Sequence, residues 1–131
     1  LRLYDIRRKD GRSPTSKVSL GHAHTNCAAF SRDGFYLAVG NADRHVIVHD
    51  VRMNRTLRDY VHGGPGRGIT HLEWRITRHY RLSLYTGGPD GSIRRWQPEG
   101  ALDHGKVVAN VGADIADFAM GNGPSEHDLV M

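Results

Sequence analysis

Cysteine is nearly absent from this sequence, and long apolar runs are missing altogether. The one cysteine, Cys27, can form no internal disulfide and leaves no cysteine–histidine pattern of the kind that binds zinc. No stretch approaches the roughly 20 consecutive apolar residues of a membrane-spanning helix, and residues 1–7 lack the apolar core of a secretory signal. We therefore expect an intracellular protein, cytoplasmic or nuclear, without a membrane partner.

Aromatic residues are also scarce, at 8% of the 131 residues, whereas charge is plentiful and unevenly distributed. All but one of the 18 lysines and arginines lie in residues 1–98, and residues 99–131 are acidic. A basic block of this kind is one signature of nucleic-acid binding. Here the arginines are scattered singly without interleaved aromatic residues, which favours an ordinary solvated surface. Nucleic acid is therefore the less favoured partner.

Internal repetition is the strongest signal in the sequence. Asp43 and Asp90 are 47 residues apart, and each follows a short apolar run and precedes an alternating one. Phe30, Trp74 and Phe118 recur at intervals of 44 residues. Spacings that agree this closely indicate a repeated structural unit of about 45 residues.

The local pattern within each unit is that of β-strands and turns. Apolar or alternating runs of four to seven residues are separated by turn residues such as Asp33-Gly34 and Asp90-Gly91. No stretch of helical length shows a 3.6-residue period. Each unit has room for four strands, and the expected strands lie near 24–31, 35–40, 45–50, 56–61, 69–74, 81–87, 92–97 and 105–110.

These units resemble the repeats of the WD-repeat family, which run about 40–45 residues from a Gly-His to a Trp-Asp. Gly21-His22 is similar to the first element, and His49-Asp50, Tyr4-Asp5 and Trp96-Gln97 are similar to the second. The resemblance implies an all-β fold of antiparallel four-stranded blades from a β-propeller. Because propellers close with about 4–8 blades, the visible chain is expected to be incomplete, with half blades at 1–20 and 111–131 around blades at 21–61 and 62–110.

The resemblance also implies a buried polar network in each blade, which joins a histidine, a hydroxyl, a turn aspartate and a tryptophan. Such groups tolerate burial when every polar atom has a partner. In the second blade the matching residues are His62, Thr86, Asp90 and Trp96. The first blade offers His22 and Asp43, but Val39 and His49 stand at the hydroxyl and tryptophan positions, so we expect that network to be incomplete.

Other chemistry fits these residues less well. The family network explains His22 and Asp43 better than an acid–base pair does, and no Gly-x-Ser-x-Gly motif is present. His22 and His24 share a strand face but have no third metal ligand at a suitable spacing. The glycine-rich stretch 62–68 lacks the Lys-Ser/Thr of a phosphate-binding loop and is interpreted as a connection between blades. We expect no catalytic site, metal, cofactor or small-molecule substrate.

A longer match concerns residues 37–52. They resemble the box by which some WD-repeat proteins dock, as substrate receptors, onto the propeller adaptor of a cullin-type ubiquitin ligase, with His49 as a departure. Arg52, and Arg7 in the similar run Tyr4-Asp5-Ile6-Arg7, follow a strand end. An arginine in that position is suited to bidentate pairing with a partner carboxylate.

The sequence therefore predicts a non-catalytic scaffold of the WD-repeat type, whose partners are other proteins or peptides. Two alternatives stay open: the ligase receptor, and an RNA- or chromatin-associated module that uses the basic surface. Loops at the blade ends should carry recognition. The residues expected there are His24, Asn26, Arg44, Arg67 and Pro89.

Overall fold

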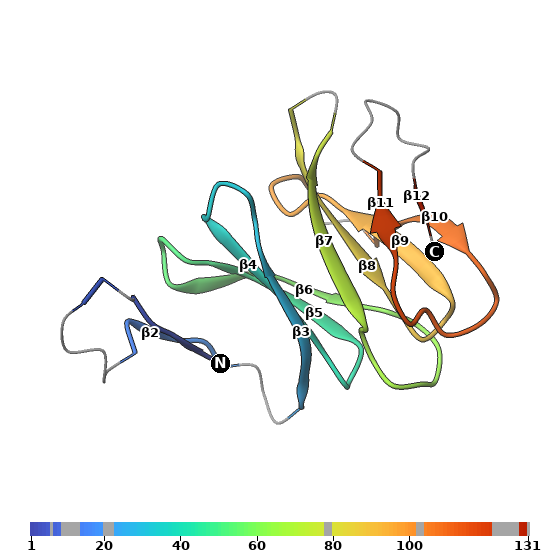
Figure 1. The fold of residues 1–131 in the computed structure, drawn as a ribbon, viewed down its shortest axis with the longest axis horizontal. Helices are drawn as coiled ribbons and strands as arrows, with labels where there is room; N and C mark the ends of the chain where they lie inside the picture. The colour runs from blue at the N-terminus through green and yellow to red at the C-terminus, as the bar shows by residue number, and fades with distance from the viewer. Residues whose placement is uncertain are drawn as a thin grey trace.

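The structure, a computed structural model, describes residues 1–5, 7–8, 14–19, 23–77, 80–101, 104–121 and 129–130. These residues form twelve β-strands (Figure 1). Within the described ranges there is no helix that is long and apolar enough to cross a membrane. The all-β fold expected from the turn and strand pattern is confirmed.

Two four-stranded antiparallel sheets make up the centre of the molecule, and each follows chain order. The first blade consists of β3 (Thr25–Phe30), β4 (Tyr36–Asn41), β5 (His45–Asp50) and β6 (Arg55–Val61). The second blade consists of β7 (His71–Ile76), β8 (Leu82–Gly87), β9 (Ser92–Trp96) and β10 (Lys106–Asn110). All eight strands lie where the sequence predicts them, and the largest shift is the later start of β7.

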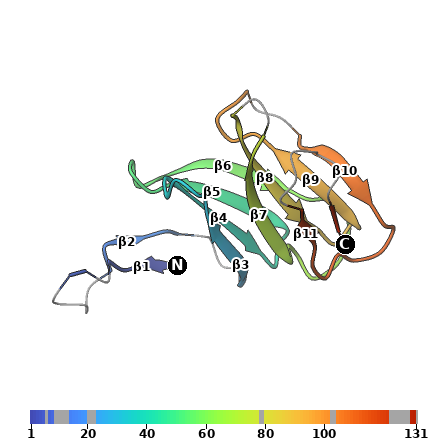
Figure 2. The ribbon, with the colours of Figure 1, turned by 45° about the horizontal axis from the view of Figure 1, so that its top comes forward.

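A short hairpin lies beside each blade, at opposite sides of the pair (Figures 1 and 2). Near the N-terminus, β1 (Arg2–Leu3) pairs with β2 (Ser16–Lys17). Near the C-terminus, β11 (Ala119–Met120) pairs with β12 (Leu129–Val130). Each range that was expected to hold half a blade thus contains one antiparallel pair of strands.

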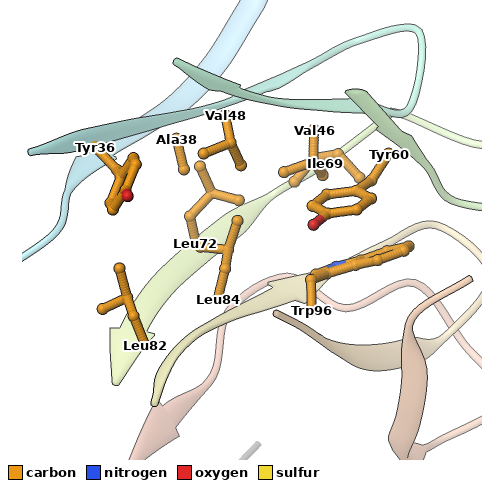
Figure 3. Close-up of a cluster of buried hydrophobic side chains, with 10 residues drawn as sticks. All are labelled: Tyr36, Ala38, Val46, Val48, Tyr60, Ile69, Leu72, Leu82, Leu84 and Trp96. Atoms are coloured by element: carbon orange, nitrogen blue, oxygen red, sulfur yellow. The ribbon is translucent and has the colours of Figure 1, made fainter. Parts of the chain in front are cut away.

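The central strands are buried on both faces because each blade is covered on both sides. Every residue of β4 and β8 is buried. Successive side chains of a strand point to opposite faces, so Tyr36 and Ala38 pack between the two blades while Leu37 and Val39 pack under the first hairpin. Figure 3 shows the cluster between the blades, where the Tyr60 and Trp96 rings stack at 4.3 Å between centroids. Covering on both faces explains why β4 reads as a continuous apolar run.

On the second strand of each blade, a glycine leaves space for an isoleucine that lies just before the following sheet. A Cβ atom on Gly40 would lie 2.5 Å from Cγ2 of Ile69, and one on Gly87 would lie 2.8 Å from Cγ2 of Ile115. Both isoleucines are almost fully buried. The two contacts repeat along the chain like the blades themselves, so they set how closely neighbouring blades approach.

Two polar contacts also join neighbouring parts of the fold. The Trp74 indole N–H donates to the Ala29 carbonyl oxygen at 2.9 Å and so ties β7 to the first blade. The Thr70 hydroxyl donates to the Ile115 carbonyl oxygen at 2.6 Å, and thereby ties the start of the second blade to the segment that follows it. Aromatic and small polar side chains thus hold each blade to its neighbour.

A Gly40→Ala substitution is expected to lower the free energy of unfolding by about 1–3 kcal/mol, because the new methyl group overlaps Ile69 and the Cys27 sulfur. Gly63→Ala is the matched control, since a Cβ there comes no closer than 3.8 Å to another side chain. Chemical denaturation of both variants measures the difference. Equal stability of the two would contradict the steric role of Gly40.

Candidate functional site

A buried polar network lies at the end of the second blade. The imidazole Nε2 of His62 is 2.5 Å from the Thr86 hydroxyl oxygen, which also accepts the indole N–H of Trp96 at 2.8 Å. Because a carboxylate only accepts and Asp90 faces Nδ1, Nε2 accepts from the Thr86 hydroxyl and the imidazole proton belongs on Nδ1. That nitrogen faces Asp90 Oδ1 at 3.5 Å. The structure therefore brings together all four residues that the sequence places in this network.

Asp90 is held ionised beneath the turn between β8 and β9. Burial alone would raise the pKa of its carboxyl, but hydrogen bonds from the side chain and main chain of Ser92 and from Arg94 outweigh it and lower the pKa to about 2. The Ser92 hydroxyl lies 2.6 Å and the Arg94 guanidinium 3.1 Å from the carboxylate. Burial lowers the pKa of His62, against the opposing pull of Asp90. A neutral imidazole thus sits beside a carboxylate anion.

This buried arrangement is suited to stabilising the fold and not to reacting with a substrate at the surface. His62 is 1% exposed, and Thr86 and Trp96 are buried as well. A general base has to come within hydrogen-bond reach of a substrate, and these groups are covered by protein. The network instead fastens the connection that enters the second blade at residue 62.

The first blade closes its turn differently. The Asn41 carboxamide oxygen accepts the main-chain N–H groups of Asp43 and His45 at 3.1 Å and 2.9 Å. Asp43 itself is exposed, so its expected place in a buried network is wrong. The second blade has Gly88 where the first has Asn41, because a Cβ there would collide with the His62 ring. The Asn41 side chain fills this space in the first blade, and the His62 ring fills it in the second. His22, the other predicted member, lies outside the described residues.

His49 occupies the position in the first blade that Trp96 occupies in the second, and its polar ring is incompletely hydrogen-bonded. It is 3% exposed, and its Nε2 is 3.3 Å from the Asn54 side-chain oxygen. Its Nδ1 has no hydrogen-bond partner among the described residues. With valine at position 39 in place of a hydroxyl, the chain of contacts seen in the second blade does not form.

The connection from β6 to β7 is fastened to the first blade at two further points. The Asn26 carboxamide donates to the carbonyl oxygens of Arg67 and Ile69 at 3.0 Å and 3.1 Å. The Arg44 guanidinium donates to the Gly64 carbonyl oxygen. Asn26 and Arg44, which were expected to face a partner, therefore hold a loop in place.

Arg44 does so from an unusual backbone conformation. Its φ is 70°, in the left-handed region that glycine favours, and Gly91 takes the equivalent turn position in the second blade with φ 73°. An arginine at this position brings a guanidinium within reach of residue 64. This contact with Gly64 explains why the turn has an arginine at position 44 instead of a glycine.

The other predicted surface residues divide in two. His24 and Arg67 are exposed at this end of the blades. Pro89 is buried, because the glycine-rich connection folds over it and Gly66 lies directly against its ring. The expectation that Pro89 contacts a partner is therefore wrong, because Pro89 is buried at this end of the blades.

Two further arginines were expected to bind partners. The Arg52 guanidinium lies 4.0 Å from the centre of the Phe35 ring and 3.7 Å from the Asp50 carboxylate, and its side chain is 51% exposed. Arg7 is 88% exposed. Its guanidinium donates two hydrogen bonds to the Asp5 carboxylate, at 3.1 Å and 3.2 Å, and its main-chain N–H donates a third at 2.9 Å, and these bonds lower the pKa of that carboxyl. Both arginines are held in position by their own neighbours while most of the charged group faces solvent.

The described residues contain no group of three histidine, cysteine, aspartate or glutamate side chains arranged to hold a metal ion. Cys27 is half-buried, and burial raises the pKa of its thiol to about 11, against a weaker effect of a main-chain hydrogen bond. A thiol with so high a pKa is protonated at neutral pH and is a poor nucleophile.

Comparison with known proteins shows what these blades are similar to. Residues 14–50 match the model of the WD domain, G-beta repeat. The β-propeller domain of Cps50 (Swd1) from Myceliophteria thermophila is 24% identical with a TM-score of 0.61, over 81% of this chain and 30% of that one. A chain of the Mitotic Checkpoint Complex is 21% identical with a TM-score of 0.59, over 85% of this chain and 32% of that one.

The computationally designed Ika4 protein is 18% identical with a TM-score of 0.66, over 84% of this chain and 62% of that one. The chain thus spans about a third of the Cps50 (Swd1) and Mitotic Checkpoint Complex chains and under two thirds of the designed protein. No curated protein matches its sequence.

Asp90→Ala is expected to lower the free energy of unfolding by about 1–3 kcal/mol, because it leaves the Ser92 hydroxyl, Arg94 and buried His62 without their acceptor. The matched control is Asp43→Ala, which removes the exposed aspartate at the equivalent turn position and should change stability by less than about 0.5 kcal/mol. Thermal and chemical melts of both variants provide the comparison. A melt of Asp90→Ala that matches the Asp43→Ala melt would refute the network assignment.

Stability is expected to fall as the pH drops below about 6.5. The folded chain keeps His62 neutral because burial lowers its pKa, whereas the unfolded chain takes up a proton near the ordinary value of 6.5. The contribution is therefore fully present at higher pH and is lost on the acid side. His62→Gln cannot titrate and should have a flatter dependence between pH 7.5 and 5.5. Identical slopes for the two proteins would argue against a buried neutral imidazole.

Proposed function

We propose that this chain is part of a WD-repeat β-propeller and acts as a non-catalytic scaffold that binds a protein or peptide at the loop end of its blades. WD-repeat propellers generally serve as protein-interaction platforms and are generally not enzymes. The loop end is the surface formed by the exposed residues around the β6–β7 connection, His24 and Arg67 among them.

The observation that carries the proposal is how firmly this connection is held. His62 anchors its start through Thr86 and Asp90, Arg44 holds Gly64, and Asn26 holds its last residues. A loop that is already ordered loses little conformational entropy when it binds. Arg67 is displayed on that fixed loop, and arginine is among the residues that contribute most to protein interfaces.

The charge of the loop end points to the chemistry of its partner. Arg67 is exposed, and the main-chain carbonyl at this position is already taken by Asn26. The planar donors of a guanidinium match a carboxylate. We infer that an acidic segment of a partner protein binds here.

A second candidate function is the receptor of a cullin-type ubiquitin ligase. The observation that favours it is the exposed Arg52 guanidinium, which rests on Phe35 and whose position is further fixed by Asp50, the acceptor of two main-chain N–H groups. A preordered arginine beyond a strand end is suited to pairing with an adaptor carboxylate. It lies at the end of the first blade away from Arg67.

Affinity purification of the full-length protein from its own cells tests both functions. A set of proteins that survives nuclease and is depleted at least about tenfold by Arg67→Glu is the expected result. Arg55→Glu is the matched control, since that arginine is exposed on the outer strand of the first blade. Loss of the set with nuclease would overturn the scaffold and favour the nucleic-acid alternative. A cullin adaptor in the set that disappears with Arg52→Ala would support the second candidate.

A further inference from the structure

A cleft opens between the two blades at the end away from Arg67. Its volume is about 180 Å³, and it is lined by the β3–β4 turn and by the ends of β7 and β8. The lining residues are Arg32, Trp74, Arg75, Ile76 and Leu82. Asn26 and the β6–β7 connection mark the opposite ends of β3 and β7, so the cleft is separate from the loop end.

The apolar wall of the cleft is rigid. The Trp74 ring is fixed by its hydrogen bond to the Ala29 carbonyl and by stacking on Tyr36, with 6.2 Å between ring centroids and 26° between ring planes. Leu82 is 8% exposed and supports the wall from below, while Ile76 is 54% exposed at the rim. An apolar surface of this kind gains free energy when it is covered, at about 25 cal/mol per Å².

A further exposed aromatic residue, Tyr80, follows the strand ends that line the cleft, where Ile76 pairs with Leu82. It lies on the connection from β7 to β8 and is 92% exposed. Its φ is 55°, in the left-handed region that is uncommon for a bulky residue. The Tyr80 N–H donates to the Thr77 carbonyl oxygen at 2.8 Å, and the Thr77 N–H donates to the Arg81 carbonyl oxygen at 2.9 Å. Tyrosine combines a large apolar ring with a polar hydroxyl, which suits it to a binding surface.

The charges around the cleft define what can enter it. Arg32 and Arg81 are exposed. The Arg75 guanidinium is 2.6 Å from the Glu73 carboxylate, which balances its charge, and it also donates to the Met120 carbonyl. The cleft therefore combines positive charge at a few points of its rim with apolar side chains, which are those of Trp74, Ile76 and Leu82. A nucleic-acid backbone needs a row of cations to replace its counterions, and this rim does not provide one.

We propose that this cleft binds a short acidic segment of a partner protein that carries one large apolar side chain. The apolar side chain packs against Trp74 and Ile76, with Tyr80 covering it from the hairpin. A neighbouring carboxylate pairs with Arg32. The proposal adds a second binding surface to the scaffold and does not depend on Arg67.

The test uses the full chain and a labelled nonapeptide with a central leucine flanked by glutamates, with binding followed by fluorescence anisotropy. Arg32→Glu and Tyr80→Ala are each expected to weaken binding about tenfold. Arg55→Glu and Tyr4→Ala are the matched controls, because both residues are exposed outside the cleft, and they should leave the affinity unchanged. Circular dichroism verifies that all four surface variants are folded.

Three outcomes would overturn the proposal. The first is equal weakening by Arg32→Glu and Arg55→Glu, which would show unspecific charge attraction. The second is equal binding of the peptide with lysines in place of the glutamates, or tighter binding of a single-stranded RNA. The third is loss of binding in Arg67→Glu with no loss in Arg32→Glu, which would place the peptide at the loop end. In that case the proposed scaffold function stands and the inference about the cleft fails.

Discussion

The face-to-face contact between the two blades is the interaction on which the rest of the molecule depends. It buries Tyr36, Val46 and Val48 of the first blade against Leu84 and Trp96 of the second. Neither face of β4 or β8 is exposed to solvent. Both faces of these strands therefore carry apolar residues, whereas a strand in a two-layer fold carries them on one face only. The loop end and the cleft lie at opposite ends of this contact, and each takes its rigidity from it.

Much of this arrangement can be predicted from the sequence because it depends on local signals. Turn residues such as Asp33-Gly34 and Asp90-Gly91 separate short apolar runs, and all eight strands of the blades are found there. The 47-residue spacing of Asp43 and Asp90 correctly identifies equivalent turns. Thr86 and Trp96 are found beside His62 because their positions within one blade follow from the repeat.

Features that depend on contacts between distant segments escaped prediction. Pro89 was taken for a surface residue because nothing local shows that the glycine-rich connection folds over it. Asp43 was placed in a network, whereas Asn41 closes that turn from two residues earlier. The fit of Gly40 to Ile69 joins residues from different blades. The recurrence of glycine at 40 and 87, and of isoleucine at 69 and 115, is the signal that would have revealed it.

Two aromatic residues, Trp74 on β7 and Phe118 just before β11, pack on the blade that precedes them in the chain. Trp74 docks on the blade that precedes it, through Ala29 and Tyr36, and Phe118 packs in the same way on Tyr85 and Ile93. During synthesis the N-terminal segments leave the ribosome first. Each incoming anchor therefore meets a sheet whose strands have already emerged, and assembly can proceed one repeat at a time in the direction of translation. Phe30, at the corresponding position of the first blade, is 52% exposed.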